Sequence, residues 1–160
     1  MRTVFWVGFW TFLADQASKY LVVHSLNLHE LGEIVAIPGF FNLRMAWNYG
    51  VNFGLFAEDS DLTRWVLIVV ALVISGAVLW WTHHEENGWQ ARVAAGFLVG
   101  GAMGNIIDRL LYGAVADFLN VTCCGFNNPY SFNIADIAVF AGAVGMVVFT
   151  GKDPGAKKPS

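Results

Sequence analysis

The chain has 160 residues, of which 56% are hydrophobic and only 13% are charged. That composition lies outside the range of ordinary soluble domains and indicates an integral membrane protein. The formal net charge is −3 and is spread along the chain, so the sequence lacks the basic patch that nucleic-acid binding needs, and a nucleic-acid partner is excluded.

Four apolar windows approach the length of about 20 residues that a membrane-spanning helix needs. They cover about residues 4–24, 62–81, 91–111 and 134–150. The sequence therefore predicts one integral membrane domain, residues 1–160, which is all-α in its four transmembrane helices. The first window carries Asp15 and has no small-x-small cleavage site, so we expect it to remain in the mature protein and not to be a cleaved signal peptide.

The distribution of Lys and Arg predicts the orientation in the membrane. With the N-terminus inside, the cytoplasmic segments hold Arg2, Arg92, Lys152, Lys157 and Lys158. The outer segments hold Arg44 and Arg64. Both termini are therefore expected in the cytoplasm. The connection of residues 82–90 becomes a short cytoplasmic turn, and the long loops of about residues 25–61 and 112–133 face outward.

The first outer loop contains a β-hairpin pattern. Residues 33–37 and 40–47 are strand-like runs on either side of Pro38-Gly39, which is a turn signal. The aromatic side chains of this loop suit a small extracytoplasmic sheet at the membrane interface, where amphipathic rings are favoured. Residues 115–121 are a candidate for a further strand.

Ionisable residues lie inside the apolar windows, where each costs roughly 2.5–3.5 kcal/mol on insertion scales and so needs a partner or a purpose. In the first window Asp15 and Lys19 are four residues apart, and mutual neutralisation alone would explain them. A functional role for this pair remains the alternative.

The third window carries a ridge of small and polar residues. Glycines at positions 96, 100 and 104 continue at steps of four into Asp108, beside Asn105 and Arg109. Such glycines permit close approach of a neighbouring helix and carry the polar group toward the interior of the bundle. Asp108 and Arg109 point about 100° apart on a helix, so we expect them to have different partners.

Two further aspartates lie at the outer ends of the expected helices. Asp117 follows the third window within an apolar, strand-like run, and it is either a solvated loop residue or a functional one. Asp136 lies three residues after Asn133, which is the spacing of a helix N-cap and its third-position acid. A cap at Asn133 would set Asp136 in place without excluding a second role. The helix N-terminus would favour the ionised form of Asp136.

Taken together, these motifs resemble bacterial lipoprotein signal peptidase, the type II signal peptidase, over nearly the whole chain. Four blocks carry the resemblance: Asp15-Gln16-Ala17-Ser18-Lys19, Asn48-Tyr49-Gly50 with Phe53, Gly100 to Arg109, and Val115 to Phe118 followed by Phe132 to Asp136. The resemblance implies a membrane-embedded aspartyl endopeptidase of the bacterial cytoplasmic (inner) membrane whose site faces outward. It also implies removal of signal peptides from diacylglyceryl-modified prolipoproteins by cleavage before the lipidated cysteine.

The resemblance further implies which residues form the site. The catalytic pair falls on Asp117 and Asp136. The supporting and substrate-binding positions fall on Asp15, Asn48, Gly50, Asn105, Asp108, Arg109, Asn133 and Ala135. The chain departs from the family pattern at Trp47, where arginine is frequent, and at Asn52, where a small residue is usual. The expected partners are lipidated prolipoproteins and membrane lipids, the expected state is a monomer, and no metal or other cofactor is required.

The chemistry of paired carboxyl groups suggests the mechanism. Two such groups a few ångströms apart share one proton, because both cannot comfortably ionise. We expect Asp136 to act as the base that activates water and Asp117 as the acid. A transporter would instead hold its acids near the middle of the membrane. An assembly protein would give no reason for the polar residues to converge.

Two segments of the outer loops remain open. Residues 46–56, with glycines at positions 50 and 54, are either a lid over the site or an aromatic anchor in the interface. The adjacent Cys123 and Cys124 have the spacing of neither a zinc site nor a loop-closing disulfide, so we interpret them as loop residues.

Overall fold

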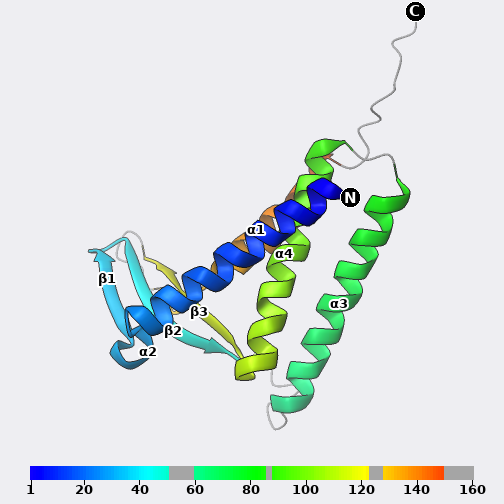
Figure 1. Ribbon diagram of the computed structural model, residues 1–160. Helices are drawn as coiled ribbons and strands as arrows, with labels where there is room; N and C mark the ends of the chain where they lie inside the picture. The colour runs from blue at the N-terminus through cyan, green and yellow to red at the C-terminus, as the bar shows by residue number, and fades with distance from the viewer. Residues whose placement is uncertain (51–59, 86–87, 123–127, 150–160) are drawn as a thin grey trace, which may run out of the picture.

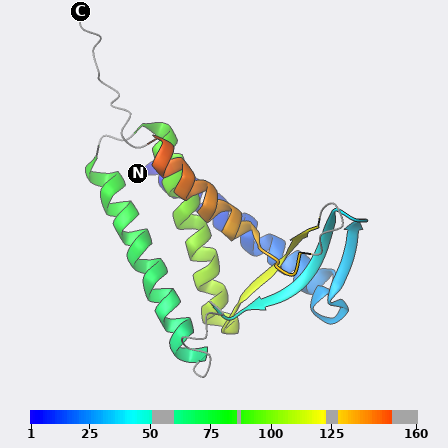
Figure 2. The ribbon, with the colours of Figure 1, turned by 180° about the vertical axis from the view of Figure 1, so that it is seen from behind.

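The computed structural model describes residues 1–50, 60–85, 88–122 and 128–149. In chain order its elements are α1 (Arg2–Lys19), the π-helical turn η1 (Tyr20–Ser25), α2 (Leu28–Leu31), β1 (Glu33–Ile37), β2 (Phe41–Asn48), α3 (Ser60–His84), α4 (Trp89–Tyr112), β3 (Val115–Val121) and α5 (Ile134–Phe149). The long helices form a bundle with the strands at one end, and α1 begins and α5 ends at the opposite end (Figures 1 and 2).

All four expected helices are present, and when the π-helical turn η1 is counted as the continuation of α1, no end lies more than three residues from its expected position. The largest difference is at the C-terminal end of α3, which continues to His84 and shortens the turn expected over residues 82–90. Among the described residues, two segments are long and apolar enough to cross a membrane, namely Asp61–His84 and Trp89–Tyr112. Helix α5 is apolar but shorter, and α1 contains several polar residues near its C-terminal end.

The outer surface of the bundle is apolar. Val73 on α3 is 64% exposed, and Phe140 and Val147 on α5 are 73% and 81% exposed. Isolated exposed apolar side chains are ordinary in soluble proteins, but a continuous apolar surface of this kind is not. It is the surface expected of helices whose solvent is lipid.

Helix α4 is the centre of the bundle and packs against α1 on one side and α5 on another (Figures 1 and 2). Glycine makes this packing possible. A Cβ atom at Gly100 would lie 2.5 Å from the carbonyl oxygen of Gly8 on α1, and one at Gly101 would lie 2.5 Å from that of Ala135 on α5. The predicted role of the glycine ridge in close helix approach is therefore confirmed.

The strands form one antiparallel sheet in the order β1-β2-β3. The expected hairpin is confirmed, with Gly39 at φ 74° in the turn, and so is the additional strand β3. In the β2–β3 pair, Ala46 is the partner of Asp117. After β3 the chain returns, and Phe132 pairs with Leu119. This pairing brings the start of α5 beside the middle of β3.

Candidate active site

Asp117 lies on the sheet and is only 3% exposed. Its two carboxylate oxygens accept hydrogen bonds from two different asparagines. The Nδ2 atom of Asn133 donates to Oδ1 at 2.7 Å, and that of Asn48, on the neighbouring strand β2, donates to Oδ2 at 3.1 Å. The reading of Asp117 as a solvated loop residue is therefore wrong, because strand pairing with β2 and the return of the chain to α5 enclose it.

Asp136 lies in the first turn of α5, where it forms a capping box with Asn133. The backbone N–H of Asp136 donates to Asn133 Oδ1 at 2.8 Å, and the backbone N–H of Asn133 donates to Asp136 Oδ2 at 3.2 Å. Reciprocal bonds of this kind satisfy donors that a helix start otherwise leaves unpaired. The N-cap interpretation of the Asn133–Asp136 spacing is confirmed. Asp136 is half-buried and so remains accessible.

Asn133 also bridges the two aspartates, since it caps Asp136 while its Nδ2 atom donates to Asp117. Asn105 on α4 completes this arrangement. Its Nδ2 atom donates to Asp136 Oδ1 at 2.9 Å, and its Oδ1 atom accepts from Asn133 Nδ2 at 3.2 Å. All four carboxylate oxygens of the pair thus accept a hydrogen bond from an uncharged group. In the described part of the chain no Lys or Arg forms an ion pair with either carboxylate.

The pKa of Asp117 is raised from the ordinary 3.8 to about 7. The main cause is burial, which disfavours the charged carboxylate, and the second is the nearby charge of Asp136. Hydrogen bonds from Asn48 and Asn133 act in the opposite direction but are outweighed. Asp117 therefore keeps a proton to near-neutral pH, so the pair offers one protonated carboxyl group beside a second carboxylate.

Behind this pair lies a buried ion triad formed by Asp15, Lys19 and Asp108. The Nζ atom of Lys19 is 2.7 Å from Asp15 Oδ2 and 2.7 Å from Asp108 Oδ2. The three residues are 0%, 6% and 1% exposed, respectively. The ion pair of Asp15 and Lys19, predicted from their spacing, is confirmed. The prediction was incomplete, because Asp108 on α4 is a second acid paired with Lys19.

Each acid of the triad also holds one backbone N–H group. Asp15 Oδ1 accepts from the N–H of Ala135 at 2.9 Å, and Asp108 Oδ2 accepts from the N–H of Ala116 at 3.2 Å. Ala135 immediately precedes Asp136, and Ala116 immediately precedes Asp117. The triad thus anchors the backbone next to both aspartates, and this gives a structural reason for the site position expected at Ala135.

Sequence reasoning assigned no role to Gln16, although it lies next to Asp15 in an apolar window. Its Nε2 atom donates to Asp15 Oδ2 at 3.1 Å and to Asp108 Oδ1 at 3.0 Å, and so links the two acids of the triad. An uncharged polar residue beside an intramembrane acid was the signal that could have identified it.

Arg109 and Asp108 have separate partners, as expected from their angular separation on the helix. Arg109 Nη1 donates to the carbonyl oxygen of Asn105 at 3.4 Å. Its Nε atom is buried and has no hydrogen-bond partner among the described residues. Electrostatically, Arg109 lies within reach of Asp108, Asp117 and Asp136, so it supplies positive charge to the site without forming an ion pair with them.

Gly50 orients the amide of Asn48. Its backbone N–H donates to Asn48 Oδ1 at 3.1 Å, which leaves the Nδ2 atom of Asn48 to face Asp117. Gly50 has φ 133°, and a Cβ atom there would lie 2.6 Å from Thr63 Cγ2. Backbone conformation and close packing therefore both require glycine at this position.

The remaining positions singled out in the sequence lie away from the aspartates or outside the described residues. The ring of Trp47 packs against that of Tyr112, with centroids 5.7 Å apart. Asn52, Cys123, Cys124 and residues 51–56 of the expected lid lie outside the described residues. The described residues contain no group of three or more His, Cys, Asp or Glu that could hold a metal ion.

Comparison with known proteins shows that most of the chain is similar to signal peptidase II and to a solved bacterial membrane enzyme. A family model described as Signal peptidase (SPase) II matches residues 7–151. A lipoprotein signal peptidase of Alteromonas mediterranea is 36% identical over 144 residues, which are 89% of this chain and 77% of that protein. One from Rhizorhabdus wittichii is 39% identical over 85% of this chain and 78% of its own. A solved structure of a bacterial membrane enzyme matches with a TM-score of 0.80 and 25% identity, covering 96% of this chain and 95% of the other.

Proposed function

The chain belongs to the signal peptidase II family of bacterial membrane proteases, and from that premise we propose that Asp117 and Asp136 are the catalytic pair of an aspartic endopeptidase. The observation that carries this proposal is the bridging of two carboxyl groups by one asparagine, with no cation paired to either carboxylate in the described part of the chain. A purely structural aspartate buried in this way would be expected to have a cationic partner, as both acids of the ion triad do.

In the proposed reaction Asp136 is the base and Asp117 is the acid. Asp136 is half-buried and lies at the start of a helix, where a negative charge is favoured, so it can accept a proton from an attacking water molecule. Asp117, with its raised pKa, donates a proton to the carbonyl oxygen of the scissile peptide and later to the leaving amine. Asn48, Asn105 and Asn133 keep the two carboxyl groups oriented throughout.

The substrate class follows from the family, whose members process prolipoproteins. We propose that this chain cleaves diacylglyceryl-modified prolipoprotein immediately before the lipidated cysteine. The test is to incubate the purified protein in detergent with a lipidated prolipoprotein and with the same precursor lacking the lipid. Release of the signal peptide from the lipidated form alone is expected. Failure to cleave a precursor that a known family member cleaves in parallel would refute the assignment.

We further propose that the chain is a single peptidase domain, monomeric in the cytoplasmic membrane, with α1, α3, α4 and α5 as its four spans. The polar residues of α1 do not contradict this, because they are paired inside the bundle and do not face lipid. Both termini then lie in the cytoplasm, and the sheet lies at the outer interface with the catalytic pair, in contact with lipid headgroups.

This orientation predicts the behaviour of reporter fusions. A reporter that is active only outside the cytoplasm should work when fused after Asp59 or Asn127 and should fail after Asn87 or at the C-terminus. The physical reason is the excess of Lys and Arg in the segments assigned to the cytoplasm. Activity in the opposite pair of fusions would place the catalytic pair on the cytoplasmic side and overturn the topology.

The raised pKa of Asp117 predicts a loss of activity on the alkaline side. If Asp117 must be protonated to act, kcat/KM should fall as the pH rises through about 7, because the proton is lost there. Initial rates at low substrate concentration between pH 5 and 9 would measure this. Melting curves over the same range are the control for unfolding. A rate that stays constant up to pH 9 would rule out Asp117 as the acid.

A further inference from the structure

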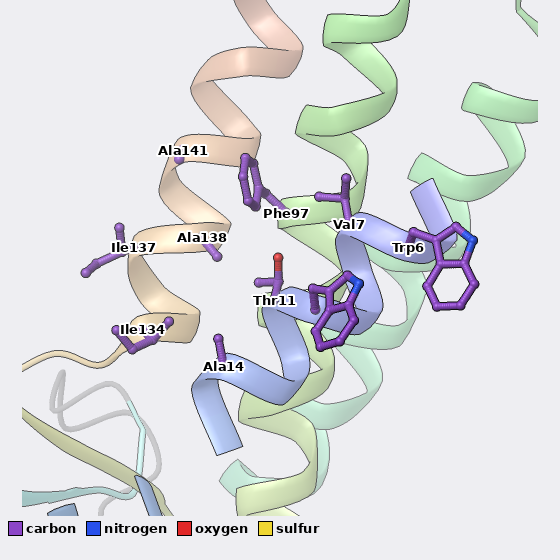
Figure 3. Close-up of a pocket in the computed structure, with 10 residues that line it drawn as sticks. Trp6, Val7, Thr11, Ala14, Phe97, Ile134, Ile137, Ala138 and Ala141 are labelled. Carbon is purple, nitrogen blue, oxygen red and sulfur yellow. The ribbon is translucent and has the colours of Figure 1, made fainter. Parts of the chain in front are cut away.

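A polar cavity lies beside the ion triad, and we call it the triad pocket. Its volume is about 260 Å³, and it is lined by Gln16, Lys19 and Asp108 together with four aromatic rings. The larger groove between α1 and α5, by contrast, has no charged side chain in its lining, as Figure 3 shows. A ligand of the triad pocket therefore has to complement charged and polar groups, and apolar surface alone is not enough.

The triad pocket lies on the face of the sheet away from the catalytic pair. Trp47 on β2 and its strand partner Ala116 on β3 both line it. Successive side chains of a strand point to opposite faces, so Asn48 and Asp117, which directly follow these two residues, lie on the other face. A ligand here would not occupy the place of the scissile peptide. It would instead contact Asp108, which holds the backbone N–H of Ala116 beside the pair.

The polar groups in the lining favour a cation that carries N–H groups. The ammonium group of Lys19 has one acceptor for each of its three N–H groups, namely Asp15 Oδ2 at 2.7 Å, Asp108 Oδ2 at 2.7 Å and Asn105 Oδ1 at 3.5 Å. The amide of Gln16 is oriented by the same two acids, because its Nε2 atom donates to both. Its Oε1 atom remains as an acceptor with no hydrogen-bond partner among the described residues.

Two pairs of aromatic rings also line the triad pocket. The ring centroids of Tyr20 and His24, both from η1, are 5.5 Å apart, and those of Trp47 and Tyr112 are 5.7 Å apart. Trp47 and Tyr112 are still 38% and 51% exposed, so their rings have surface left for a ligand. The face of an aromatic ring attracts a cation, and that of tryptophan does so most strongly. The aromatic rings therefore favour the same ligand charge as the polar groups.

We propose that the triad pocket binds the ethanolamine headgroup of a phospholipid of the outer leaflet, with its primary ammonium group between Gln16 Oε1 and the rings of Trp47 and Tyr112. The proposal rests on the membrane orientation proposed above, which places this end of the bundle at the outer interface (Figure 1). A water molecule takes up about 30 Å³ in the liquid, so the pocket has room for roughly eight or nine non-hydrogen atoms, about the size of phosphoethanolamine.

Other headgroups match the triad pocket less well. The quaternary ammonium of phosphatidylcholine would meet the aromatic rings, but it has no N–H group to donate to Gln16 Oε1. The anionic headgroup of phosphatidylglycerol would face the carboxylate of Asp108, while every N–H group of Lys19 already has an acceptor. The primary ammonium matches both the rings and the free acceptor.

The first test compares headgroups on the purified protein in detergent. Short-chain phosphatidylethanolamine, phosphatidylcholine and phosphatidylglycerol with identical acyl chains are added, and the melting temperature is recorded. At ten times its Kd, phosphatidylethanolamine should raise the melting temperature by about 3–6 °C. The other two lipids should need roughly tenfold higher concentrations for the same shift. Equal shifts by all three lipids would overturn the proposal. Because melting requires no substrate, the result is independent of the peptidase function.

The second test assigns the headgroup preference to the triad pocket. Trp47→Leu removes one ring and should abolish the preference for phosphatidylethanolamine, and Tyr112→Leu should do the same. Trp89→Leu is the matched control, because it removes a 68% exposed indole at the start of α4, outside the pocket, and should keep the preference. Trp47→Arg adds a cation to the lining and should shift the preference to phosphatidylglycerol. A preference for phosphatidylethanolamine that survives both changes at Trp47 would overturn the proposal.

Discussion

Replacing either Asp117 or Asp136 by asparagine is expected to reduce cleavage by roughly 10²–10⁴-fold, because proton transfer by a positioned side chain contributes about that much to a rate. Asparagine keeps the shape of aspartate, and its one carbonyl oxygen can still accept a hydrogen bond from a neighbouring asparagine. It cannot hold or release the shared proton. The measurement is single-turnover release of signal peptide from lipidated prolipoprotein by each purified variant.

The matched control is Asp61→Asn, which changes the same chemical group on α3. The Asp61 side chain is 82% exposed and lies 3.9 Å from Arg64, so its removal should leave both activity and melting temperature nearly unchanged. Both variants of the pair should melt near the wild type, which would separate lost chemistry from lost structure. Substantial turnover by either variant would eliminate the two-aspartate mechanism.

Replacing Lys19 by methionine is expected to destabilise the protein by about 3–5 kcal/mol, the typical cost of removing one partner from a buried ion pair. The change would leave Asp15 and Asp108 as two buried acids with their common cation removed. It should also lower activity, because these acids hold the N–H groups of Ala135 and Ala116 beside the catalytic pair. Denaturant or thermal unfolding in detergent, with cleavage rates measured in parallel, would test both effects.

Two further variants make this test specific. Adding Asp108→Asn to Lys19→Met removes one of the stranded charges, so the double variant should be less destabilised than the sum of the single changes. Arg44→Met, at an exposed position on β2, should have almost no effect on stability. Additive single and double effects, or a Lys19→Met variant as stable as Arg44→Met, would show that the triad does not contribute as its geometry implies.

The sequence by itself determined the features that depend on local pattern. Helix positions followed from apolar windows of sufficient length, and the hairpin followed from a turn signal between strand-like runs. The Asn133–Asp136 capping box and the Asp15–Lys19 pair were predictable because their partners are three and four residues apart on one helix. The glycines of α4 indicated close packing because only a small residue permits it.

Only the tertiary structure decided which distant residues meet. Lys19 gains Asp108 as a second partner from α4, and Asp15 reaches Ala135, which lies 120 positions away in the sequence. These contacts form only when each helix is rotated about its axis so that its polar face points at the neighbouring helix. Helical periodicity identifies the polar face of a helix but does not identify the residues that pack against it. Sequence spacing alone therefore left the role of Asp15 open.

The same reason explains the raised pKa of Asp117. The proton affinity of Asp117 depends on burial between β2 and α5 and on the distance to Asp136. Desolvation is a property of packed surfaces, so it arises only when segments far apart in the chain come together.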